Sequence, residues 1–167
     1  MKELLQRYSS YNVWANHRLV FAMADLTDAQ WYEEVPSSFN SLFKTVLHMW
    51  DAESIWWQRM RMHESFIVPS KTFDPSPKDL CNGWLQQSMQ WEEFVKSEPL
   101  DEATLQSQLH YKNLKGEPFV QPVCGVILHV FNHNTYHRGQ LITMLHALGV
   151  QSFPATDYVH WARTVMA

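Results

Sequence analysis

Three histidines, His129, His133 and His137, follow one another at intervals of four residues toward the C-terminus. Residues four apart on a helix lie above one another on one face, so either adjacent pair could hold one metal ion. All three could not, because the outer two would stand about 12 Å apart along the helix axis at a rise of 1.5 Å per residue. The spacing therefore indicates a metal-binding element with two histidine ligands.

The pair His133 and His137 interrupts an apolar row of the same predicted helix. The row advances in steps of three or four residues and comprises Val126, Val130, His133, His137, Leu141, Met144 and Leu148. A buried imidazole without a partner costs about 1–3 kcal/mol, so two in successive turns need a common explanation. Metal ligation is one explanation. Two others stay open: nearby hydroxyls or carbonyls satisfy both rings, or the helix is rotated and exposes them.

A third ligand would have to come from another helix, because a catalytic zinc site commonly has three protein ligands and one open position. His48 is a candidate, since it lies at the edge of an apolar arc and could turn inward; otherwise it is a boundary histidine without a ligand role. Asp51, one turn later, is either an acceptor for a ligand imidazole or a solvated charge, which we favour. Arg138 could bind an anionic substrate or pair with an acidic side chain.

The other five histidines have polar neighbours, lie near element ends or fall outside the row, and we expect them on the surface: His17, His63, His110, His146 and His160. Other chemical motifs are missing from the sequence. It contains no Glu-x-x-His pair of the di-iron bundles, no HExxH motif, no GxSxG motif and no P-loop. Di-iron, zincin, serine hydrolase and NTPase functions therefore have no support.

Four long amphipathic helices must position these residues. Apolar periodicity predicts them over residues 2–24, about 41–64, about 77–97 and 122–148. Asn40 or Ser41 would cap the second helix, Ser76 and Pro77 would begin the third, and Gly149 would end the fourth. Pro122 is expected at the first position of the fourth helix.

The intervening segments predict how the helices connect. Residues 68–77 contain three prolines and are typical of a crossover loop, while residues 104–121 predict a short β-hairpin with its turn at 113–116. Residues 154–161 predict a short C-terminal helix that folds back. We therefore expect an all-α four-helix bundle with a crossover connection, formed by residues 1–167 as a single domain.

Composition narrows the classes of partner. The chain has 13 Lys and Arg against 17 Asp and Glu, a net charge of -4, and no basic stripe, which argues against nucleic acid. No apolar run approaches the roughly 20 residues that cross a bilayer. Cys81 and Cys124 form no disulfide framework, which suits a reducing cytosol. We expect a cytoplasmic protein with a small-molecule substrate and no membrane partner.

Residues 132–140, NHNTYHRGQ, closely resemble the NHxxxHRGQ signature of the DinB/YfiT-like superfamily of metalloenzymes. Three further segments support the likeness: YNVWAN at residues 11–16, Leu47-His48, and the PxxDY tail that begins at Pro154. The resemblance covers nearly the whole chain and implies the same four-helix bundle.

The resemblance also implies a ligand set. His48, His133 and His137 match the three family histidines that bind a divalent metal, nickel or zinc, which leaves His129 as a neighbour and not a ligand. It further implies a homodimer and a damage-inducible, stress-response gene. Some relatives are thiol-dependent enzymes, among them mycothiol-dependent maleylpyruvate isomerase and bacillithiol S-transferase.

The leading hypothesis is a metal-dependent transferase in which a low-molecular-weight thiol takes the open metal position and attacks a small electrophile. Coordination would deprotonate the thiol without a separate base. One alternative is a hydrolase that uses metal-bound hydroxide. The other is a non-enzymatic stress-response module whose metal is structural and closed by a fourth protein ligand. The sequence does not decide whether the protein is an enzyme, nor does it identify the substrate or the native metal.

Overall fold

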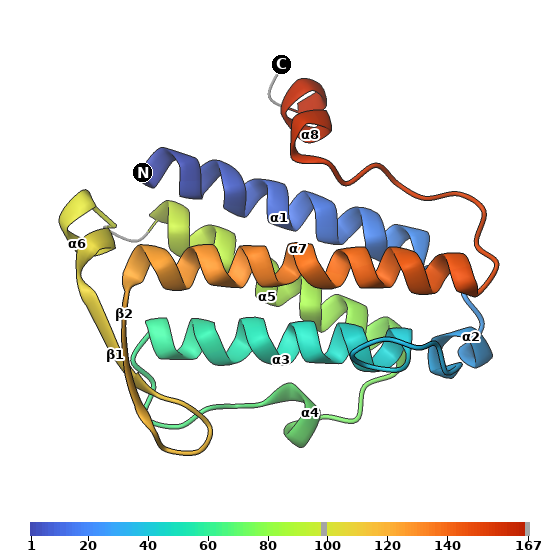
Figure 1. The fold of residues 1–167 in the computed structure, drawn as a ribbon, viewed down its shortest axis with the longest axis horizontal. Helices are drawn as coiled ribbons and strands as arrows, with labels where there is room; N and C mark the ends of the chain where they lie inside the picture. The colour runs from blue at the N-terminus through green and yellow to red at the C-terminus, as the bar shows by residue number, and fades with distance from the viewer. Residues whose placement is uncertain (98–99, 166–167) are drawn as a thin grey trace.

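Four long helices lie side by side in the computed structural model, which describes residues 1–97 and 100–165 (Figure 1): α1 (Lys2–Ala22), α3 (Leu42–Met60), α5 (Pro77–Ser97) and α7 (Val123–Ala147). Both α1 and α3 pack against α5 and α7, so α1 and α3 are diagonal to each other. Figure 1 shows α1 and α7 running in one direction and α3 and α5 in the other. Because α3 and α5 are parallel neighbours, residues 61–76 must return along the bundle, which confirms the predicted crossover.

Local capping explains most helix boundaries. Ser41 Oγ accepts a hydrogen bond from Lys44 N at 3.2 Å at the start of α3, and Ser76 Oγ accepts one from Asp79 N at the start of α5. Gly149 follows α7 with a positive φ of 84°, and its N–H donates to His146 O. A capping box formed by residues 27 and 30 opens the short helix α2 (Asp28–Tyr32).

Two predicted boundaries are wrong. The second long helix ends at Met60 and not near residue 64, because Met62 adopts a left-handed conformation with φ 55°. Its N–H and that of His63 bond back to Arg59 O and Gln58 O and close the helix end. Pro122, predicted as the first residue of the fourth helix, is the last residue of a strand, and α7 begins one residue later.

Shorter elements decorate the bundle. The helix α4 (Pro69–Thr72) interrupts the crossover loop, and α6 (Glu102–Gln106), which was not predicted, precedes the hairpin. The predicted hairpin is confirmed: β1 (Gln108–Lys112) pairs antiparallel with β2 (Pro118–Pro122). The helix α8 (Tyr158–Val165) packs on α1 through Trp161, which is 3% exposed. Among the residues described, no helix is both long enough and apolar enough to cross a membrane.

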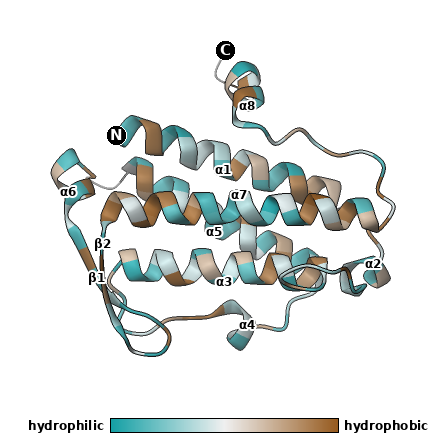
Figure 2. Cartoon of the chain, viewed as in Figure 1, coloured by the Kyte–Doolittle hydropathy of each residue, from teal (hydrophilic) through white to brown (hydrophobic). Residues whose placement is uncertain are grey.

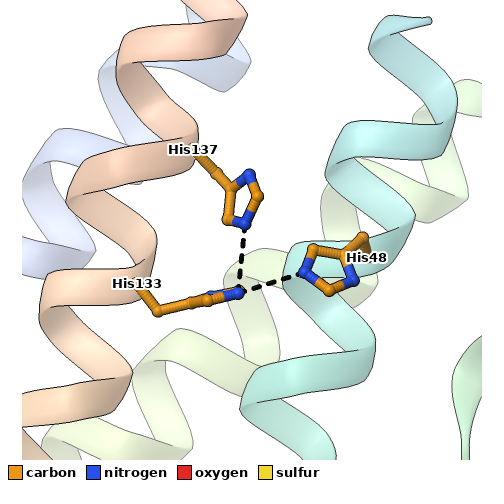
Figure 3. Close-up of side chains that lie close together, drawn as sticks. All are labelled: His48, His133 and His137. Atoms are coloured by element: carbon orange, nitrogen blue, oxygen red, sulfur yellow. Dashed lines mark hydrogen bonds between the residues drawn. The ribbon is translucent and has the colours of Figure 1, made fainter. Parts of the chain in front are cut away.

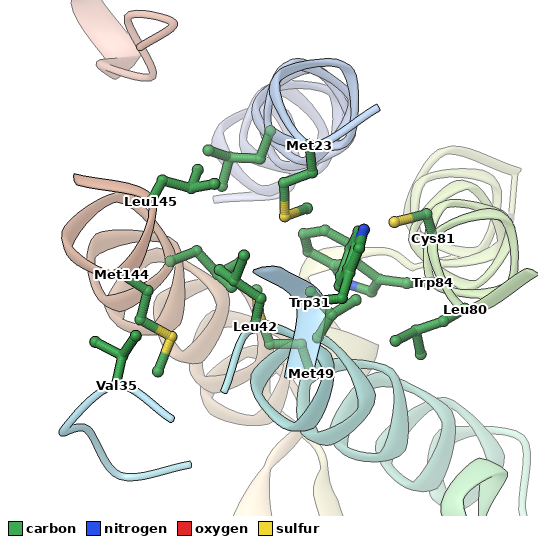
Figure 4. Close-up of a cluster of buried hydrophobic side chains, with 13 residues drawn as sticks. Met23, Trp31, Val35, Leu42, Met49, Leu80, Cys81, Trp84, Met144 and Leu145 are labelled. Carbon is green, nitrogen blue, oxygen red and sulfur yellow. The ribbon is translucent and has the colours of Figure 1, made fainter. Parts of the chain in front are cut away.

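The bundle interior has two apolar clusters with a polar layer between them. One cluster lies at the α2 end, where Met23, Leu42, Trp84 and Leu145 meet (Figure 4). The other lies at the hairpin end around Trp91, Ile127 and Phe131. Figure 2 shows the same division along α7, whose apolar ends flank a polar middle. All four long helices contribute buried side chains to the polar layer: Asn12, Asn16, Glu53, Ser88, Asn134 and Arg138.

Candidate metal centre

His48 of α3 and the pair His133 and His137 of α7 point their rings toward one common position (Figure 3). The Nε2 atom of His133 lies 3.0 Å from Nε2 of His48 and 3.1 Å from Nε2 of His137. A tetrahedral ion with Zn–N bonds of about 2.05 Å sets its ligand nitrogens about 3.3 Å apart. The separations in this cluster are close to that value, so the three rings could hold one metal ion.

The protonation of the rings favours a cation. Burial lowers the pKa of all three imidazoles, and it lowers the pKa of His133 to about 3 with help from the neighbouring rings of His137 and His48. The rings are therefore neutral at pH 7, the form that binds metals. One N–H on His133 cannot serve two neighbouring nitrogens at once, whereas a cation would accept lone pairs from all three. The donor set thus fits a divalent metal.

Gln140 fixes the orientation of His137. The amide oxygen of Gln140 lies 2.7 Å from Nδ1 of His137 and can only accept, so Nδ1 carries the proton and Nε2 keeps its lone pair. The amide nitrogen of Gln140 donates to Ser38 Oγ at 2.9 Å and to Tyr136 OH at 3.1 Å. These contacts tie the α2–α3 loop to the metal-binding face of α7.

Phe39, in the same loop, covers one side of the centre. Its ring stacks on His48 with centroids 4.0 Å apart and an interplanar angle of 22°, and it lies 5.8 Å from the ring of His137. His129 lies on the opposite side, 5.9 Å from the ring of His133, and packs edge-on against Trp56. It is exposed and does not belong to the cluster of donor atoms.

Comparison with known proteins agrees with the arrangement of these residues. A family-wide sequence comparison matches residues 1–165 to the DinB family. The chain belongs to the DinB family. It is 23% identical over 165 residues to Protein DinB of Bacillus subtilis (strain 168), which covers 95% of this chain and 93% of the relative. A crystal structure from Exiguobacterium sibiricum, described as a DinB-family member, shares the fold with a TM-score of 0.66 at 15% identity. That match covers 93% of this chain and 97% of the other.

In this DinB-family chain, Arg138 is buried inside the bundle and does not face the metal centre. The side chain is 2% exposed, and Nη1 donates to Asn12 Oδ1 at 2.7 Å and to Asn16 Oδ1 at 2.8 Å. Nη2 donates to Thr135 Oγ1 at 2.7 Å. Both sequence-based interpretations of Arg138 are therefore wrong: it is closed to substrate, and its direct partners are neutral. Its link to an acid is indirect, because Asn16 also contacts Glu53.

Glu53 of α3 is the central acceptor of the polar layer. Its carboxylate accepts hydrogen bonds from Asn134 Nδ2 at 2.6 Å, Trp84 Nε1 at 3.2 Å and Ser88 Oγ at 2.8 Å, and Asn16 Nδ2 lies 3.5 Å away. Burial raises the pKa of Glu53 to about 7, although these donors act to lower it. One carboxylate thus joins all four long helices of the bundle.

The polar layer also sets the rotation of α7. Asn134 and Arg138 each follow a metal-site histidine, so α7 turns one face to the centre and the adjacent face to Glu53 and α1. Hydrogen bonds on the second face therefore hold His133 and His137 toward α3. This is a physical reason for alternating histidines with buried polar residues.

The remaining predictions for single residues are mixed. Asp51 is half-buried and neither orients a ligand imidazole nor stays free in solvent, because its Oδ1 accepts from Ser70 N at 2.8 Å at the start of α4. Its charge acts to raise the pKa of His48. The five histidines expected on the surface are all exposed: His17, His63, His110, His146 and His160. Sequence reasoning missed Phe39 and Glu53, and it noted Gln140 only as part of a motif.

Proposed function

We propose that this protein binds a divalent transition metal, zinc or nickel, through His48, His133 and His137 and acts as a metal-dependent thiol S-transferase. The observation that carries the proposal is the convergence of three neutral imidazoles without a fourth protein donor. Among the described residues, the cluster of donor atoms contains these three histidines and no Cys, Asp or Glu. A site of this composition leaves one position for an exogenous ligand.

The residues of the site divide the work of forming it. His48 supplies a ligand from α3, and the i, i+4 pair supplies two from α7. Gln140 holds Nε2 of His137 unprotonated, and Phe39 shields one face of His48 from water. When bound, the metal would supply the positive charge that deprotonates a coordinated thiol at neutral pH. The resemblance to thiol-dependent relatives in the superfamily supports the choice of a thiol.

The activity test uses metal-loaded protein, glutathione as the thiol and chlorodinitrobenzene as the electrophile. We expect thioether formation above the uncatalysed rate, and a loss of at least about tenfold in His133→Ala, because removal of a ligand weakens both metal affinity and activity. His146→Ala is the matched control, since His146 lies two turns beyond the site and is exposed. Equal rates in His133→Ala and the unaltered protein would remove the metal from the reaction.

Two other functions use the same histidines and are separated by further measurements. A hydrolase would cleave activated esters with metal-bound hydroxide and would not require a thiol. A structural metal module would have four protein ligands. X-ray absorption of the zinc-loaded protein counts these ligands: three nitrogens and one exchangeable ligand support the proposal, whereas four protein ligands contradict both enzymatic functions.

A further inference from the structure

A cavity of about 520 Å³ lies between the C-terminal end of α3, the loop that follows it and the β1–β2 hairpin. Its size falls in the range of small-molecule sites, which span about 300–1,000 Å³. Arg59 of α3 lines the cavity together with Phe66 of the loop and Tyr111, Lys112 and Phe119 of the hairpin. We call this space the hairpin cavity.

Arg59 is a buried cation with spare hydrogen-bond donors. The residue is 8% exposed, and only its Nη2 is bonded, to Lys112 O at 3.0 Å. Its Nε is buried without a partner, and no carboxylate in the described part of the chain pairs with the guanidinium. A buried charged donor without a partner is costly, so this arrangement has room for an anionic acceptor.

Aromatic rings hold the guanidinium in place. Its central carbon lies 4.6 Å from the ring centroid of Trp56, 5.1 Å from that of Tyr111 and 5.5 Å from that of Phe66. Such contacts fix the plane of the guanidinium, which then presents its donors in a defined direction. The site is therefore preorganised around one cationic group.

The remaining walls fit a flat, apolar body attached to an anion. Phe66 and Phe119 are 37% and 41% exposed, and the ring of Phe119 stacks on Tyr111 with centroids 5.8 Å apart. Lys112 adds a second positive charge to the lining, whereas Glu64 is its one acidic residue. This excess of positive charge occurs in a chain whose net charge is -4.

We propose that the hairpin cavity binds a small organic anion, with its carboxylate or phosphate at Arg59 and a flat apolar body against Phe66, Tyr111 and Phe119. The site is distinct from the metal centre. Arg59 follows His48 by eleven residues on the same helix, which places the two about 16 Å apart along its axis. The inference therefore does not depend on the metal or on thiol transfer.

The test is a nuclear magnetic resonance titration of the ¹⁵N-labelled full chain with benzoate, phenyl phosphate and uncharged benzamide. We expect benzoate or phenyl phosphate to bind with millimolar affinity, typical of ligands with few atoms. The shifts should centre on the Arg59 Nε–H, the Trp56 indole and the hairpin amides. Comparison of the two anions shows which anionic group the cavity prefers. Benzamide binding as tight as benzoate binding would refute anion recognition, as would the absence of binding by either anion up to about 50 mM.

Variants locate the site. Arg59→Met should weaken binding of the preferred anion at least about tenfold, because it removes a charge-assisted hydrogen-bond donor. Arg59→Lys keeps the charge and the fold but loses the planar fork, so its affinity should lie between those of Arg59→Met and the unaltered protein. Arg61→Met is the matched control and should bind normally, since Arg61 lies over Trp57 and outside the cavity lining. Unchanged affinity in Arg59→Met would overturn the proposal.

A last comparison separates this site from the metal centre. Metal-free and zinc-loaded protein should bind the anion with equal affinity, and His133→Ala should not alter it. Binding that appears only with zinc and disappears in His133→Ala would mean that the anion coordinates the metal, and the assignment to Arg59 would be wrong.

Discussion

Replacement of Glu53 by glutamine removes a buried negative charge and keeps the shape of the side chain. Glu53 is 1% exposed and lies among donors from α1, α5 and α7. A glutamine can retain the acceptor oxygen that faces Asn134 and Trp84 and place its amide nitrogen toward Ser88. The hydroxyl of Ser88 can then donate to Trp84 O, which lies 3.1 Å away. The substitution thus isolates the effect of the charge.

The magnitude follows from the pKa of Glu53, which burial raises from an ordinary value of 4.5 to about 7. The folded protein holds this proton more tightly than the unfolded chain, so the stability that the group contributes is complete below pH 4.5. It is lost as the pH rises through 7. Each pH unit in that interval is worth about 1.4 kcal/mol, which gives a loss of about 3 kcal/mol. Glutamine cannot ionise and is spared this loss.

We therefore expect the free energy of unfolding of Glu53→Gln, relative to the unaltered protein, to rise by about 3 kcal/mol between pH 5 and pH 8. Urea denaturation of both proteins, followed by circular dichroism at several pH values, measures this difference. The subtraction cancels the titration of the buried histidines, which both proteins share. Glu33→Gln changes an exposed carboxylate and should give a flat difference. A flat difference for Glu53→Gln, or one that falls with pH, would refute the assignment of a buried, weakly acidic Glu53.

Three further predictions concern packing. Arg138→Met should lower the free energy of unfolding by about 3 kcal/mol in urea, because three amide and hydroxyl partners lose a buried cation; a loss below about 1 kcal/mol would contradict its role in the polar layer. Gly83→Ala should destabilise the protein by about 1–3 kcal/mol, since a Cβ there would overlap the ring of Trp50. Gly139→Ala, where a Cβ would meet nothing within 4 Å, should instead stabilise α7 by up to about 1 kcal/mol, and thermal melting that ranks the two alanine variants in the reverse order would refute this packing. Trp161→Ala should release α8, so that limited proteolysis cleaves residues 149–157 faster than in the unaltered protein; equal cleavage rates would show that Trp161 does not anchor the tail.

Sequence alone predicts those features that depend on local chemistry. The caps at Ser41 and Ser76 and the stop at Gly149 each involve residues within one turn, and the structure confirms them. The early end of α3 was missed because Met62 takes a left-handed conformation that usually calls for glycine or asparagine. No residue type in that stretch indicates the break.

The metal centre could be predicted only in part. Spacing pairs His133 with His137, but the choice of His48 needed the family resemblance, because no local rule relates residues 85 positions apart. Arg138 was misjudged because periodicity was read as one buried stripe, whereas α7 is buried on two adjacent faces, against α3 and against α1. Glu53 escaped notice because a charged residue on an amphipathic helix is normally solvated.

Metal content tests the central claim most directly. Purified protein is loaded with zinc or nickel, dialysed and analysed by plasma mass spectrometry alongside His48→Ala, His133→Ala and His129→Ala. We predict one tightly held ion per chain in the unaltered protein and in His129→Ala, and its loss in the other two variants. Full occupancy in both His48→Ala and His133→Ala, or an unaltered protein that retains no metal, would contradict the three-histidine centre.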